Sequence, residues 1–164
     1  MMNNISPRDL ITLHDVKLIF RNFSGEARRF NNAGDRNVTI VLTPAQSMML
    51  RERGYNVKTL APYREGDEPQ DILKVNVSYR YQKPTVVTIT SRSRVELDED
   101  TVGILDYAFI TKADISFRGS AWTMSNGDSG VSAYLNSLYV TLEEDELAAE
   151  YAQMPMPSDD EDPF

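Results

Sequence analysis

The stretch that decides the fold is Ile72–Gln82, which reads ILKVNVSYRYQ. Apolar or aromatic residues occupy every second position and alternate with polar or charged ones. A period of two is typical of a β-strand that buries one face, because successive side chains point to opposite sides of a sheet. The apolar face carries Leu73, Val75, Val77, Tyr79 and Tyr81; the polar face carries Lys74, Asn76, Ser78 and Arg80. The sequence therefore predicts a strand over Ile72–Gln82, with Tyr79 in the core.

Similar patterns on both sides of this stretch predict a mostly β chain. Further strands are expected over Asp15–Asn22, Arg36–Leu42, Thr85–Arg92, Phe109–Arg118 and Ser132–Leu142. Thr43-Pro44 is a typical helix start and Gly54 a typical helix stop, so a helix is expected from Pro44 to about Arg53. A shorter helix is expected over Val102–Tyr107. Roughly five to seven strands with one or two short helices predict an OB-type small β-barrel, closed so that no strand edge is exposed.

Charge divides the chain into a body and an acidic end. The whole chain has a net charge of −8, from 17 Lys and Arg against 25 Asp and Glu. Nine of the acids and none of the basic residues lie in residues 143–164, which leaves 17 basic and 16 acidic residues in the body. One face of the body can therefore be basic although the chain is acidic. The predicted organisation is an OB-fold domain over residues 1–142, an acidic helix over Glu143–Tyr151 and a disordered, flexible C-terminal tail.

Residue types exclude most enzyme classes. The chain has no cysteine and one histidine, His14, which excludes disulfides, cysteine nucleophiles and multi-histidine metal sites. Its glycines form neither a phosphate-binding loop nor a dinucleotide fingerprint. No apolar run approaches the roughly 18 residues of a transmembrane helix. We expect no catalytic residue, metal, cofactor or membrane association. The acids Asp98-Glu99-Asp100 are interpreted as capping the helix at Val102, with metal ligation as the alternative.

Basic residues interleaved with aromatic ones are the positive functional signal. Binding of single-stranded nucleic acid requires cations along the phosphates and flat side chains on which bases stack. The candidate phosphate contacts are Arg21, Arg28, Arg29, Arg36, Lys74, Arg80, Lys83, Arg92 and Arg94. The candidate stacking residues are Phe23 and Phe30 on the hairpin before Arg36, Tyr81 at a strand end, and Trp122 in a polar loop. The prediction is that these residues converge in one concave strip.

The C-terminus carries a second, more specific signal. Four consecutive acids, Asp159, Asp160, Glu161 and Asp162, precede a terminal Pro163-Phe164. A solubility tail has no need of a terminal aromatic residue. A partner protein can bury the ring of Phe164 while its basic residues bind the terminal carboxylate and the acids. Residues 159–164 are therefore predicted to bind a partner protein.

Five stretches of the chain resemble a family of phage-encoded single-stranded-DNA-binding proteins. The matching stretches are Asn22–Gly25 with Phe30-Asn31, Gly34–Asn37, Gly54–Lys58, Asp98–Asp106 and Ala133–Val140, spread over Asp15 to Leu147. The tail is similar to that of bacterial single-stranded-DNA-binding proteins, which end in aspartates followed by Ile-Pro-Phe; here Asp162 stands in place of the isoleucine. The resemblance implies an OB fold, binding of replication intermediates and a place in phage DNA metabolism.

Together these observations predict a non-catalytic protein that binds and protects single-stranded DNA during phage replication and recombination. It would act in the cytoplasm of the infected bacterial host and recruit replication or recombination proteins through its tail. Three alternatives stay open: an adaptor or structural protein, a strand-annealing protein, and a nuclease that uses Asp98–Asp100 as metal ligands. The sequence decides neither homo-oligomerisation nor the preference between DNA and RNA.

Overall fold

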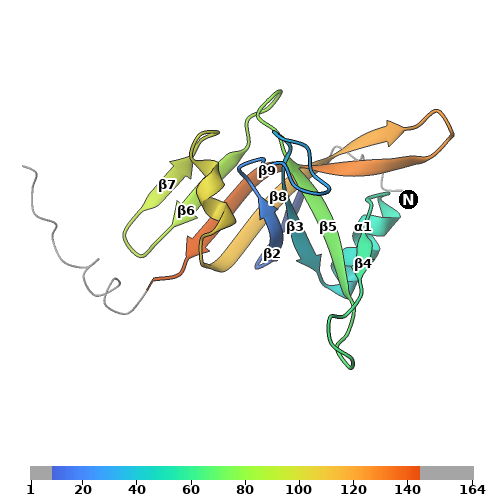
Figure 1. Cartoon of the computed structure of the whole chain (residues 1–164), viewed down its shortest axis with the longest axis horizontal. Coiled ribbons are helices and arrows are strands. Elements are labelled where there is room, and N and C mark those ends of the chain that lie inside the picture. The colour runs from blue at the N-terminus through green and yellow to red at the C-terminus, as the bar shows by residue number, and fades with distance from the viewer. Residues whose placement is uncertain (1–8, 145–164) are drawn as a thin grey trace, which may run out of the picture.

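A computed structural model describes residues 9–144 of the chain (Figure 1). The strands are β1 Ile11–Leu13, β2 Lys17–Asn22, β3 Arg36–Leu42, β4 Lys58–Leu60, β5 Gln70–Val77, β6 Thr85–Ile89, β7 Arg94–Leu97, β8 Ile110–Thr123 and β9 Ser129–Leu142. The helices are α1 Pro44–Glu52 and a 3₁₀ helix, η1 Val102–Asp106. The mostly β prediction is confirmed. From residue 145 onward, the expected acidic helix and the tail lie outside the described residues.

The sheet is an open barrel, so the prediction of a closed one was wrong. Its nine strands follow the order β1-β8-β9-β5-β3-β2, with β4 on β5 and β6-β7 branching from β9. Within residues 9–144, β1 pairs with β8 and β2 with β3, but the two end strands do not pair with each other. Strands β8 and β9 are 14 residues long and run through the length of the molecule (Figure 1). The other strands pair with different parts of them, β1 with Ile115–Phe117 of β8 and β6 with Ser137–Thr141 of β9, and so do not follow one another around a closed ring.

The sheet divides along one edge of β9. On its other edge β9 pairs antiparallel with β8. On the dividing edge it pairs in parallel first with β5, where Asn76 faces Tyr134, and then with β6, where Thr85 faces Ser137. Thr85 follows Asn76 by nine positions, whereas their partners are three positions apart. The connection over residues 78–84 must therefore loop out of the sheet. This is why β5 ends at Val77 and not at Gln82 as predicted.

The core lies inside the curved sheet and is built from the alternating residues of its strands. Ile40, Val75, Phe117 and Leu138 are among the fully buried side chains. In β5 and β9 buried residues alternate with more exposed neighbours over much of each strand, as the sequence predicts, whereas β3 buries Val38, Thr39 and Ile40 in succession. The predicted strand Arg36–Leu42 is confirmed residue for residue.

Helix α1 forms where its flanking residues predict it. Thr43 and Gln46 form a reciprocal capping box, Pro44 occupies the first turn, and Gly54 adopts a φ of +87° just beyond the C-cap. The helix buries Leu50 against the sheet. In the described part of the chain no helix is long and apolar enough to cross a membrane.

Candidate nucleic-acid interface

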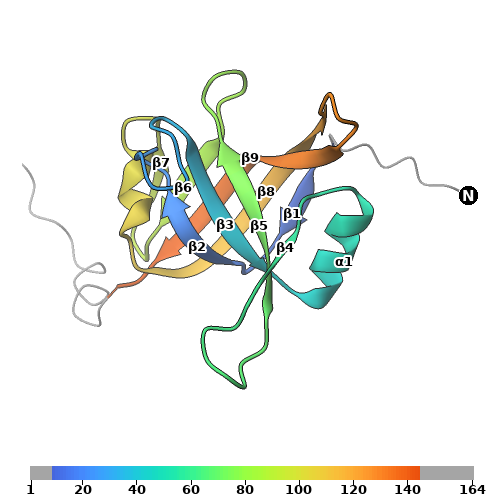
Figure 2. The same ribbon diagram turned by 45° about the vertical axis from the view of Figure 1, so that its right-hand side comes forward.

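A groove of about 910 Å³ opens where β5 leaves β9. The β2–β3 loop, the β5–β6 loop and residues of strands β8 and β9 border it. In Figure 2 both loops lie along the upper side of the molecule. Its lining is formed by Gly34, Asp35, Arg36, Lys74, Asn76, Val77, Ser78, Tyr79, Arg80, Tyr81, Gln82, Lys83, Glu99, Arg118, Ser120, Tyr134, Leu135 and Asn136. Residues from five separate segments thus meet at the division of the sheet.

Five of the lining residues are cations that form no ion pair within residues 9–144. They are Arg36, Lys74, Arg80, Lys83 and Arg118. Each ion pair in the described residues uses other side chains. Lys74 lies on the outer face of β5, as the alternation predicts, and the loop out of the sheet carries Arg80 and Lys83 to the same groove. Unneutralised cations gathered in a groove attract a polyanion.

Three tyrosines lie among these cations. Tyr81 is 91% exposed, because it lies on the loop beyond the end of β5. Tyr134 is 42% exposed and faces Arg118 across the β8–β9 register. Tyr79 packs partly against the core, as predicted, but one part of it also lines the groove. The exposed rings of Tyr81 and Tyr134 and the partly buried ring of Tyr79 offer flat surfaces beside the cations.

Tyr79 is held in place by Arg36. The Arg36 guanidinium lies 5.5 Å from the centre of the Tyr79 ring and donates a hydrogen bond of 2.7 Å to the carbonyl of Phe23. Burial raises the pKa of the Tyr79 hydroxyl, Arg36 lowers it, and the carboxylates of Glu99 and Asp98 raise it. In the described residues this buried hydroxyl has no hydrogen-bond partner. The groove therefore has one rigid wall, built from Arg36 and Tyr79.

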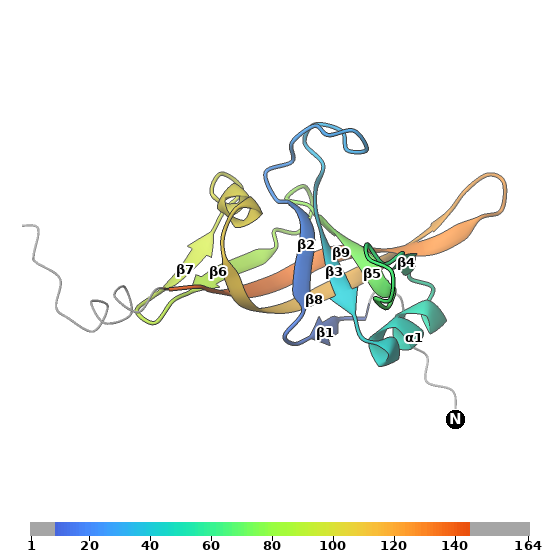
Figure 3. The same ribbon diagram turned by 60° about the horizontal axis from the view of Figure 1, so that its bottom comes forward.

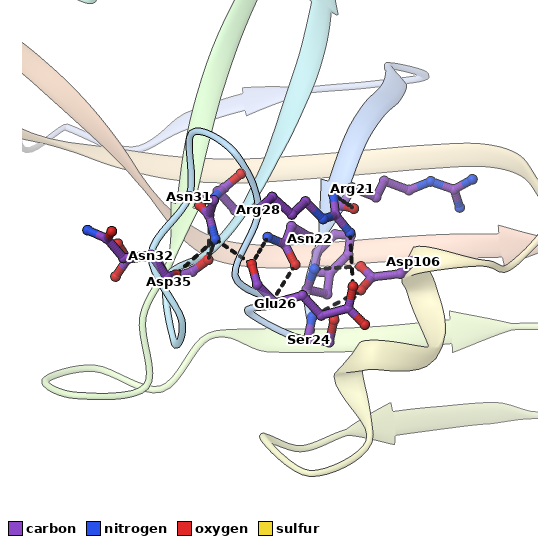
Figure 4. A network of polar contacts seen from close by, with 11 residues as sticks. Arg21, Asn22, Ser24, Glu26, Arg28, Asn31, Asn32, Asp35 and Asp106 are labelled. Atoms are coloured by element: carbon purple, nitrogen blue, oxygen red, sulfur yellow. Dashed lines mark hydrogen bonds and ion pairs between the residues drawn. The ribbon is translucent and has the colours of Figure 1, made fainter.

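The β2–β3 loop reaches the groove because η1 clamps its base. Asp106, on η1, accepts hydrogen bonds from the backbone N–H groups of Phe23 (2.5 Å) and Ser24 (3.2 Å) and from the Ser24 hydroxyl. Figure 4 shows this contact, with Asn31 pointing inward to the loop carbonyls that it binds. The loop and η1 lie on the same side of β8 and β9 (Figure 3). These bonds position Asp35 and Arg36 at the rim.

The structure corrects the prediction for Phe23. Its ring is 0% exposed and belongs to the core, so it is not available to stack on a base. The cause is an irregularity in β2: the register with β3 shifts between Ile19 and Asn22, and Phe20 adopts a φ of +48°. A shift of one position exchanges the two faces of a strand. Phe20 is consequently exposed, and Phe23 is buried.

Of the thirteen predicted DNA-binding residues, the groove brings together Arg36, Lys74, Arg80, Tyr81 and Lys83. Arg29 and Phe30 form an exposed cation–π pair on the β2–β3 loop, and Arg92 and Arg94 lie on the β6–β7 hairpin. Arg21 and Arg28 donate to backbone carbonyls. Trp122 lies on β8, not in a loop, and its indole covers Gly130. The predicted single strip therefore contains only part of the set.

Arg118 and Tyr134 are groove residues that the sequence prediction missed. Each follows a buried residue and precedes another: Arg118 lies between Phe117 and Gly119, and Tyr134 between Ala133 and Leu135. The same alternation used for Ile72–Gln82 places both side chains on the outer face of their strands. What the alternation could not show is that β8 and β9 pair at this position.

The acidic turn before η1 is closed by hydrogen bonds to the Asp98 side chain. The Asp98 side chain accepts hydrogen bonds from the backbone N–H groups of Asp100 (2.9 Å) and Thr101 (3.0 Å) and from the Thr101 hydroxyl (3.0 Å). The Thr101 hydroxyl is the main cause that lowers the pKa of Asp98. Across residues 9–144, His, Asp and Glu side chains form no group of three or more that could hold a metal ion. The N-cap of η1 is Thr101, with no side-chain cap hydrogen bond, so the prediction that these acids cap the helix was wrong: Asp98 instead closes the turn before it.

Comparisons with solved structures agree on the fold. The single-stranded DNA-binding protein of bacteriophage Enc34 in complex with ssDNA is similar over 83% of this chain and 88% of its own, with 11% identity and a TM-score of 0.55. Another structure of that phage protein covers 83% and 82%, with 10% identity and a TM-score of 0.53. A search of curated proteins by sequence found no match. The model of the family described as "Putative phage ssDNA-binding domain" matches residues 2–162. The chain therefore belongs to this phage ssDNA-binding domain family.

Proposed function

We propose that this protein binds single-stranded DNA in the groove between β5 and β9, and that it protects the strand without catalysing a reaction on it. The observation that carries the proposal is the gathering around one groove of three tyrosines and five cations that form no ion pair in the described part of the chain. Membership of the phage ssDNA-binding domain family and a fold shared with a phage protein solved in complex with ssDNA support it.

Each part of the groove has a role in the proposal. Lys74, Arg80, Lys83 and Arg118 contact phosphates, which gives affinity without sequence information. The exposed rings of Tyr81 and Tyr134 stack on bases, and every base has a face that can stack. Stacking requires unpaired bases, so this mode selects single strands over duplexes.

A titration of the full chain with fluorescently labelled oligo-dT tests the proposal. We expect saturable binding of oligo-dT at moderate salt and much weaker binding of a duplex of equal length. Replacing Tyr81 by alanine should weaken binding of oligo-dT about tenfold, since stacking contributes about 1–3 kcal/mol per base. Fluorescence anisotropy measures both effects.

Tyr63→Ala is the matched control for Tyr81→Ala. Tyr63 is 99% exposed and lies on the loop between β4 and β5, outside the groove. Its removal should leave the affinity unchanged. Equal effects of the two substitutions would argue against the groove as the DNA-binding site. No saturable binding by the unaltered protein would argue for an adaptor without DNA-binding activity.

The proposal extends to the biological setting. The protein would coat single strands exposed during phage replication and recombination, in the cytoplasm of the infected host. The tail residues Asp159–Asp162 with Pro163 and Phe164 would recruit replication or recombination proteins. The chemistry of the tail supports this role, because it joins an apolar ring to a cluster of negative charges.

The same tail should compete with DNA for the groove. Deleting Ser158–Phe164 removes four acidic side chains from a chain whose groove cations have no ion-pair partner among residues 9–144. We expect the truncated protein to bind oligo-dT severalfold more tightly at low salt, with the difference vanishing as salt screens the charges. Unchanged or weaker binding at low salt would contradict this competition. A tail of equal length with Asn and Gln replacing the acids separates charge from length.

A further inference from the structure

The groove contains two carboxylates that its cations do not neutralise. Asp35 lines it from the β2–β3 loop, and Glu99 lines it from the turn before η1. No ion pair or side-chain hydrogen bond involves the Glu99 carboxylate within the described residues. A negative charge repels phosphate, so Glu99 opposes the affinity that the surrounding cations provide. The Glu99 carboxylate would therefore interact favourably with an atom of the ligand other than a phosphate oxygen.

The turn around Glu99 is held by hydrogen bonds and presents this one acid to the groove. Asp98 is occupied by the backbone and hydroxyl of Thr101 and by the backbone N–H of Asp100. Asp100 is exposed and does not line the groove. Three consecutive acids therefore have three different environments. Of the three, only Glu99 lines the groove. Burial is the main cause that raises the pKa of the Tyr79 hydroxyl, and the charge of Glu99 raises it further.

The base edges of an unpaired strand provide the donors that a carboxylate can accept. Cytosine and adenine each present an exocyclic amino group, and guanine presents an amino group beside a ring N–H. Thymine presents one ring N–H between two carbonyl oxygens, which repel a carboxylate. Acidic side chains accept from the cytosine amino group in known protein–DNA contacts. A base held by the groove's tyrosines shares the groove with Glu99.

We propose that Glu99 is a specificity-determining residue that reads base edges and favours bases with an amino group over thymine. The inference rests on the proposed function, because it assumes that the groove holds single-stranded DNA. It goes beyond that function in giving the protein a base preference, although stacking and phosphate contacts alone would tolerate any base.

The test compares oligo-dC with oligo-dT of equal length, for the full chain and for Glu99→Ala. Because the two oligonucleotides differ in their own stacking, the informative quantity is the change in the affinity ratio between proteins. We expect Glu99→Ala to reduce the preference for oligo-dC over oligo-dT by about three- to tenfold. Most of that change should come from weaker binding of oligo-dC.

Asp100→Ala is the matched control. It removes the same charge at the next residue, and Asp100 does not line the groove. It should leave the ratio between the two oligonucleotides unchanged. If Glu99→Ala tightens both oligonucleotides equally, Glu99 only repels phosphates and the inference is overturned. Failure of the unaltered protein to bind either oligonucleotide would instead refute the proposed function, so the two failures are distinguishable.

Discussion

Replacing Phe23 by alanine is expected to lower the free energy of unfolding by about 3–5 kcal/mol, the usual cost of truncating a fully buried phenylalanine. The ring is 0% exposed and lies where the irregularity of β2 turns it into the core. The neighbouring backbone is fixed by Asp106, so the core has little freedom to collapse around the cavity. Urea denaturation followed by circular dichroism measures the change.

Phe30→Ala is the control for this prediction. Phe30 is 90% exposed on the same loop, so its removal should change the free energy of unfolding by less than about 0.5 kcal/mol. The comparison also tests the correction of the sequence prediction, which assigned both rings to base stacking. If Phe23→Ala left stability unchanged but weakened binding of oligo-dT, the ring would be a stacking surface after all.

The two phenylalanines show what local sequence patterns can and cannot predict. A composition rich in Val, Ile and Thr predicted the strand Arg36–Leu42, and alternation predicted the outward direction of Lys74, because both are properties of a single strand. The burial of Phe23 depends on a register shift between β2 and β3. No sequence pattern within β2 predicts that shift, because it depends on how β2 pairs with β3.

The groove was only partly predictable for a similar reason. Tyr81 continues the alternation of β5 in sequence, yet it lies on a loop because β6 takes over the edge of β9. Arg118 and Tyr134 are far apart in sequence and meet through the β8–β9 register. Trp122, predicted in a loop, lies on β8 because that strand is longer than its apolar pattern. Positions that depend on pairing between strands distant in sequence are the ones that could not be predicted.

The second large effect is expected from removing three groove cations together. The triple variant Lys74→Ala, Arg80→Ala, Arg118→Ala should bind oligo-dT about a hundredfold more weakly at roughly 0.1 M salt. Each cation that neutralises a phosphate of a single strand contributes about 0.7 to the slope of log affinity against log salt. The slope should therefore become shallower by about 2. Titrations at four or five salt concentrations measure both quantities.

A control variant of equal charge separates the groove from the overall charge of the protein. Lys58 lies on β4, Arg64 on the β4–β5 loop and Arg92 on the β6–β7 turn, all exposed and outside the groove. Replacing these three by alanine removes the same net charge, which changes the long-range field but no phosphate contact in the groove. The salt slope should then stay close to that of the unaltered protein. A slope that falls equally in both triple variants would mean that DNA follows a path spread over the whole surface, because only direct neutralisation of phosphates releases counterions in proportion to the cations removed.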